Sequence, residues 1–262
     1  MKLWKSLLIV SVISVSCSVL EDRAECPIYV SVKAQTESDC LVSFFSAGGD
    51  LLDSRMIAAE DMRSGNNRTQ IPRRDFHVSV LMNKWNMELR GDKVVCMVEG
   101  REAAPVYAYS LHHIPSDNYP NDEIVIDGPL MKQHALVKLR FTVDEGTGFP
   151  YFIRLYGEHN GFNLLTLAAE EGRCVIMPRM GESLETEFVL TRQQQEDPIM
   201  LFLLDEKTGV ESAAIEIGQY ITKAGYDWNA DSLGDIDIAV DLSEMTIAIR
   251  ISDWKEELIE IF

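Results

Sequence analysis

Long apolar runs, basic charge and closely spaced cysteines are all scarce in this chain. A membrane-spanning helix needs about 20 consecutive apolar residues, whereas the apolar stretch Leu7–Val15 is followed almost at once by the charged residues 21–23. Lys and Arg total 24 against 42 Asp and Glu, which gives a net charge of −18 spread over 262 residues. Nucleic-acid binding requires a sustained basic surface. We therefore expect no nucleic-acid partner and no lasting transmembrane helix.

The cysteines contain no C-x-x-C pair, so zinc and thioredoxin-like chemistry have no support. Four of them are widely separated: Cys26, Cys40, Cys96 and Cys174. An exported location would permit disulfides, but Cys96 and Cys174 stand in apolar segments typical of buried small residues. Their pairing stays open at this point.

The common catalytic motifs are also absent: G-x-S-x-G, H-E-x-x-H and the Gly-rich phosphate loop. The histidines are expected at exposed or edge positions rather than as metal ligands, and adjacent ones should point to opposite faces of a strand; they are His77, His112, His113, His134 and His159. The acidic segments 144–148 and 227–235 lack the EF-hand spacing and are predicted as turns. We expect no enzyme, catalytic residue, metal or cofactor, with a secreted hydrolase as a minor alternative because carboxylate pairs can meet in space alone.

The first 16 residues have the anatomy of an export signal: Lys2 and Lys5, then an apolar run broken only by serines. Ser16 precedes Cys17, as a lipoprotein signal peptidase requires, so Cys17 is the predicted lipid-attachment residue and 17–26 a short tether. The alternative is an ordinary signal peptide. Removing residues 1–16 leaves 22 basic against 42 acidic residues, a net charge of −20.

Short strand-like segments separated by Gly, Asn, Asp and Pro fill the rest of the chain, which predicts an all-β protein. Turn residues cluster before residue 130, so we predict two tandem β-sandwiches, 27–129 and 130–262. In 134–143, alternate apolar residues share one face. Segments 235–242 and 246–254 alternate similarly around Ser243–Met245 and predict a terminal hairpin. The region 213–218 is predicted as strand, with helix as the alternative.

Three tryptophans are candidates for stacking on sugars, although core packing is their commoner use; they are Trp85, Trp228 and Trp254. They support an alternative function, a surface glycan-binding lipoprotein of a polysaccharide-uptake system.

The stretch "CSVLEDRAECPIYVSV" resembles the mature N-terminus of the fimbrillin-associated anchor family of Bacteroidota-type bacteria. "GPLMKQHALVKLRFTV" is similar to the opening strand of that family's second domain, and "DIDIAVDLSEMTIAIRISDW" to its closing hairpin. Many members have a second Cys after the proline, where this chain has Ile28, which leaves the role of Cys26 open.

The resemblance implies two transthyretin-like Greek-key β-sandwiches in tandem and an outer-membrane lipid anchor on Cys17. It also implies a place at the base of a fimbria, where the protein tethers the polymer and limits its length without catalysis. Its partners would be fimbrial subunits, bound by strand addition to an unpaired edge. The candidate edges are Ile28–Val32 and the terminal hairpin.

Overall fold

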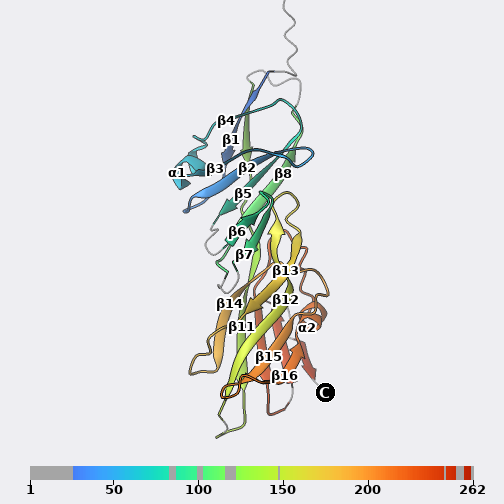
Figure 1. Cartoon of the computed structure of the whole chain (residues 1–262). Coiled ribbons are helices and arrows are strands. Elements are labelled where there is room, and N and C mark those ends of the chain that lie inside the picture. The colour runs from blue at the N-terminus through green and yellow to red at the C-terminus, as the bar shows by residue number, and fades with distance from the viewer. Residues whose placement is uncertain are drawn as a thin grey trace, which may run out of the picture.

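The structure is a computed structural model that describes residues 26–82, 87–98, 103–115, 122–146, 148–244 and 246–251, together with the backbone of 257–260. The molecule is elongated, with the N-terminal part at one end and the C-terminal part at the other (Figure 1). The described elements are overwhelmingly strands, which confirms the predicted all-β class. Neither described helix has the length and apolar character that crossing a membrane demands.

The N-terminal part packs a three-stranded sheet against a five-stranded one. The first sheet has the order β4 (Thr69–Ile71), β1 (Ile28–Lys33), β9 (Glu123–Asp127). The second has the order β10 (Met131–Lys132), β8 (Tyr107–His113), β5 (Phe76–Met82), β2 (Cys40–Ser46), β3 (Leu51–Ile57). Alternation explains the packing, because Ile28, Val30 and Val32 of β1 all face the core with no exposed surface. Helix α1 (Ala59–Ser64) adds the buried Met62 to this core.

The C-terminal part is a second pair of sheets. One has the order β14 (Glu185–Thr191), β11 (His134–Thr142), β17 (Ile236–Asp241), β18 (Thr246–Ile251), β19 (Glu257–Glu260). The other has the order β16 (Glu211–Glu216), β15 (Met200–Asp205), β12 (Tyr151–Asn163), β7 (Val94–Met97), β6 (Met87–Arg90), and β13 (Ala169–Ile176) also pairs with β12. Helix α2 (Gly218–Lys223) places Ile221 in the core between them.

Two predicted elements of the C-terminal part are confirmed. The terminal hairpin forms as β17 and β18, paired antiparallel from Ile236 opposite Ile251 to Asp241 opposite Thr246. In β11 the predicted apolar face is buried at Ala135, Val137, Leu139 and Phe141. The region 213–218 is predicted as strand with helix as the alternative, and it contains both: β16 ends at Glu216 and α2 begins at Gly218.

The β6–β7 hairpin departs from the order of the chain. It lies within the predicted first domain, 27–129, yet it continues the second domain's sheet, with Gly161–Asn163 of β12 opposite Cys96–Val94 of β7. Green β6 and β7 accordingly lie between the two ends of the molecule (Figure 1). The division at residue 130 stays a prediction, with this hairpin as a structural link across it.

Gly161 makes that link possible. A Cβ placed on it would lie 1.9 Å from the carbonyl oxygen of Val95 and 2.7 Å from the Cα of Cys96. Both are backbone atoms, which cannot swing aside as a side chain does. Only glycine allows β12 and β7 to approach this closely.

We expect Gly161→Ala to lower the free energy of unfolding by roughly 1–3 kcal/mol, because the added methyl group forces the two strands apart. Urea denaturation followed by circular dichroism measures the change. Gly148→Ala is the matched control, since a Cβ there meets no atom within 4 Å. Equal stability of the two variants would show that the pairing tolerates the methyl group.

Candidate functional site

The predicted lipid-attachment residue lies outside the described residues, as do the signal and most of the tether. Cys17 therefore stays a prediction. The described chain starts with the half-buried Cys26, and β1 begins two residues later at Ile28.

The four described cysteines are all free thiols. Cys96 and Cys174 are buried as predicted, and burial raises the pKa of the Cys174 thiol to about 12. Protonated, buried thiols behave as small apolar side chains. No disulfide joins these four residues.

The histidine prediction is wrong for two residues, because His134 and His159 are only 3% and 4% exposed. Nδ1 of His159 lies 2.6 Å from the Asp197 carboxylate, and Nδ1 of His134 lies 3.0–3.1 Å from the backbone of Val106. A polar partner for each ring offsets the cost of burial, which alternation alone does not reveal.

The adjacent residues His112 and His113 point to opposite faces of β8, as predicted. The His112 ring stacks on His77 with 4.5 Å between centroids, whereas His113 contacts the core residue Phe76. Among the described residues, no three His, Cys, Asp or Glu side chains group as metal ligands would.

Trp228 belongs to the core. It is 1% exposed and meets the Tyr226 ring edge-on at 4.6 Å, so it offers no face for stacking on a sugar. Trp85 and Trp254 lie outside the described residues.

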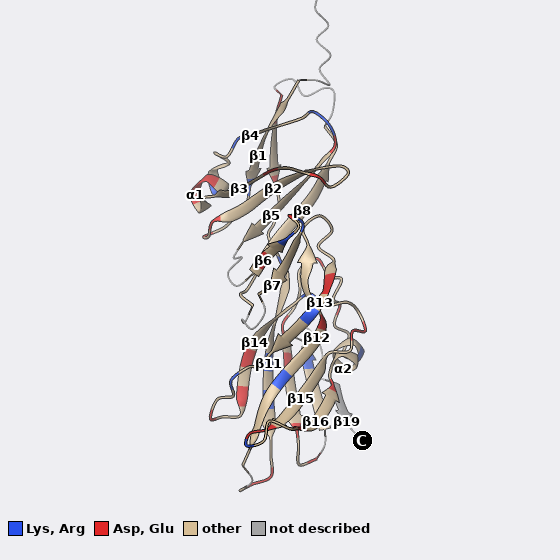
Figure 2. Ribbon diagram, viewed as in Figure 1, with Lys and Arg blue, Asp and Glu red and all other residues tan. Residues whose placement is uncertain are grey.

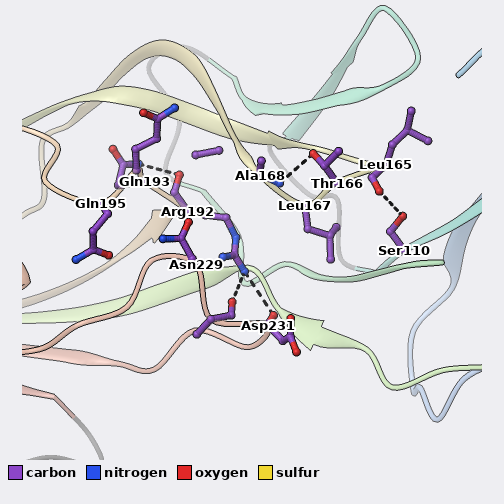
Figure 3. Close-up of a pocket in the computed structure, with 13 residues that line it drawn as sticks. Ser110, Leu165, Thr166, Leu167, Ala168, Arg192, Gln193, Gln195, Asn229 and Asp231 are labelled. Carbon is purple, nitrogen blue, oxygen red and sulfur yellow. Dashed lines mark hydrogen bonds between the residues drawn. The ribbon is translucent and has the colours of Figure 1, made fainter. Parts of the chain in front are cut away.

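A pocket of about 590 Å³ opens at the junction of the two sandwiches (Figure 3). Ser110 of β8 contributes one wall and donates a hydrogen bond of 2.8 Å to the carbonyl of Leu165, in the turn between β12 and β13. The opposite wall carries the successive polar residues 192–195 and the segment 229–231. The pocket is thus built from both parts of the chain.

Arg192 is the buried cation of this junction, only 4% exposed. Its guanidinium donates to Oε1 of Gln133 at 2.8 and 3.1 Å, and to the carbonyls of Trp228, Ala230 and Asp231. Figure 3 shows the side chain reaching toward the segment with Asn229 and Asp231. Burial lowers the pKa of Arg192, but a guanidinium stays charged in proteins.

These contacts give the acidic segment 227–235 a structural role. It forms turns, as predicted, and its carbonyls accept from Arg192. The Asp235 carboxylate accepts from the backbone of Leu136 at 2.9 Å and pairs with Lys132. The segment is therefore held against the start of β11 at the junction. The sequence did not predict a buried role for Arg192. Its one distinguishing feature in the sequence is its position directly after the strand β14.

No protein-family model matches the sequence, and no curated protein matches it in sequence. Solved structures do match the fold along nearly its whole length. One is a candidate polysaccharide-binding protein from Bacteroides thetaiotaomicron, with a TM-score of 0.64 and 11% identity over 91% of this chain and 99% of that one. Another is the fimbrial anchor protein Mfa2 from Porphyromonas gingivalis, with a TM-score of 0.63 and 15% identity over 90% of this chain and 100% of that one. A candidate adhesin from Bacteroides ovatus has a TM-score of 0.62 and 13% identity, over 93% and 98% of the two chains.

The chain shares the fold of these proteins. The predicted resemblance to the fimbrillin-associated anchor family is thereby confirmed for the fold. Because the match extends over both sandwiches, it includes the junction at which the β6–β7 hairpin crosses.

One predicted docking edge of this fold is wrong. Ile28–Val32 lies in β1, the middle strand of its sheet, which pairs antiparallel with β4 and parallel with β9. The second candidate, the terminal hairpin, is also covered: β17 lies between β11 and β18, and β18 pairs with β19 on its other side. In the described residues its sheet ends at β19, a strand that covers β18 only from Thr246 to Ile249.

Replacing Arg192 by Leu should lower the free energy of unfolding by roughly 3 kcal/mol or more, because the buried Gln133 oxygen and the loop carbonyls lose their donor. Urea denaturation gives the loss directly. Arg154→Gln is the control, since Arg154 pairs with Glu211 at 3.5 Å on the surface and should cost under about 1 kcal/mol. If the two variants unfold alike, Arg192 does not hold the junction.

Proposed function

We propose that this protein is a lipid-anchored outer-membrane subunit that tethers a fimbria to the cell surface and limits its length. The observation that carries the proposal is the whole-length match of both sandwiches to the fold of the fimbrial anchor Mfa2. The proposal includes fimbrial subunits as partners and no catalytic activity, cofactor or metal.

The anchoring step is assigned to Cys17. Acyl chains contribute about 0.8 kcal/mol per buried methylene, so more than one chain holds a protein at a membrane durably. Without residues 1–16 the chain carries a net charge of −20, which anionic headgroups repel. An acylated Cys17 would keep the chain at the membrane while the folded part projects away from it.

A tether must also carry load along its length. The two sandwiches are joined by main-chain hydrogen bonds between β7 and β12 and by the Ser110–Leu165 bond, in addition to the connecting chain. Pulling them apart would require breaking these bonds together, which suits a subunit held at one end by lipid and at the other by a polymer.

The proposed contact with the fimbria is strand pairing at the end of the β17–β18–β19 sheet. An edge strand presents unpaired N–H and C=O groups that another chain can use. In the described part of the chain, four residue pairs join β19 to β18, against six between β17 and β18. A fimbrial strand could therefore add to β19 or take its place with little disruption.

Cys17→Ala should move the protein from the membrane fraction to the soluble fraction, because the acylated thiol is lost. Fractionation with immunoblotting measures the distribution, and mass spectrometry of the native N-terminal peptide identifies the acyl group. Cys26→Ala serves as the control and should stay with the membrane. Retention of Cys17→Ala after a high-salt wash would disprove lipid anchoring.

A chain ending at Ile251 should stay in the membrane fraction but lose its fimbriae, because the docking strand β19 is missing. Electron microscopy of cells and co-purification of fimbrial subunits give the readout. Thermal unfolding of the truncated chain checks that the remaining sandwich is intact. Normal fimbriation with a folded, truncated chain would rule out this edge.

A further inference from the structure

A second pocket, of about 460 Å³, opens where the β6–β7 hairpin meets β12 and β13. We name it the arginine pocket after two of its lining residues, and define it by Glu88 and Arg90 of β6, Asn160 of β12, and Gly172 and Arg173 of β13. The pairing of β12 with β13 shifts register on both sides of His159. Such irregularities re-aim side chains and are frequent beside binding sites.

The two arginines are exposed and lack acidic partners. No carboxylate of the described residues, including Glu88, lies within salt-bridge distance of either guanidinium. Arg173 instead lies 5.9 Å from the centre of the Tyr156 ring. Figure 2 shows basic charge on β13 in a molecule whose acidic residues are widely distributed. With a net charge of −18, two unpaired cations at one pocket favour an anionic ligand.

Asn160 supplies a polar group at the base of the pocket. Its side chain is 8% exposed, and its Oδ1 has no hydrogen-bond partner among the described residues. A Cβ on Gly172 would lie 2.1 Å from that oxygen, so glycine is needed for the amide to occupy this place. The oxygen has almost no solvent-accessible surface, so Asn160 shapes the polar wall of the pocket, packed against Gly172.

We propose that the arginine pocket binds a terminal acidic sugar of a glycan. The guanidiniums of Arg90 and Arg173 would hold the carboxylate, for which the planar donor fork of arginine is well matched. The exposed Glu88 carboxylate would accept hydrogen bonds from the sugar hydroxyls. The volume lies in the range of small-molecule sites.

Charge selects a single acidic sugar over a polyanion. A ligand with many negative charges is repelled by the rest of this acidic chain, whereas one carboxylate meets two arginines against the single carboxylate of Glu88. An acidic peptide fits less well, because peptides that bind sheets use main-chain bonds along an edge. In the arginine pocket, by contrast, the hydrogen-bonding groups are side chains that line a cavity.

The test titrates the full-length, detergent-solubilised protein with 3′-sialyllactose and with lactose, which differ by one acidic sugar, by calorimetry. The first should bind saturably and the second should not. Arg90→Gln with Arg173→Gln should weaken binding by about tenfold or more, since two charged hydrogen-bond donors are lost. Gly172→Ala should also weaken it by displacing the Asn160 amide. Arg154→Gln, on β12 but outside the pocket, is the matched control and should bind normally.

Four results would overturn the proposal: no saturable binding of 3′-sialyllactose, equal binding of lactose, undiminished binding by the double arginine variant, or equally tight binding of a poly-glutamate peptide or inorganic sulfate. Thermal unfolding of each variant separates loss of the site from loss of the fold. Ligand binding at the arginine pocket is independent of the proposed fimbrial role, because a chain that ends at Ile251 or lacks Cys17 keeps every residue of the pocket.

Discussion

The antiparallel pairing of β7 with β12 is the interaction on which the rest of the structure depends. It brings a hairpin from the first half of the chain into the second half's sheet, with Gly161 opposite Cys96. The arginine pocket exists because β6 lies on that sheet beside β13. The junction pocket forms where the turn after β12 meets β8. Both candidate sites are thus products of one strand pairing between segments about 65 residues apart.

Positive charge is scarce in this protein, and much of what is present has a structural role. Arg192 ties the 228–231 turn to Gln133, Lys132 pairs with Asp235, and the almost fully buried Arg73 pairs with Asp122. Each of these cations fixes a loop at an end of a sandwich. The remaining acidic surface keeps like-charged molecules apart, so contacts with a partner must come from main-chain edges or from local exceptions such as Arg90 and Arg173.

Alternation of apolar residues was sufficient to predict the strands whose one face is buried, including β11 and the β17–β18 hairpin, because the period of two is a local property. Strand order is not local. The sequence around Ile28 predicts a strand equally well at an edge or in the middle, and the parallel pairing with β9 decides the outcome. The burial of His159 depends on Asp197, 38 residues later. Arg90, Asn160 and Arg173 carry no shared motif, and only the bulged β12 assembles them.

The crossing hairpin also sets an order of events for the folding chain. Residues 87–97 pair with each other as β6 and β7, but β12, whose sheet they extend, lies about 65 residues later, so folding includes an interval before the two are joined. Throughout it Met87, Val95 and Met97, all buried in the finished protein, remain exposed to water. The same crossing that links the two halves of the folded molecule therefore makes the burial of these three side chains depend on a contact between distant parts of the chain.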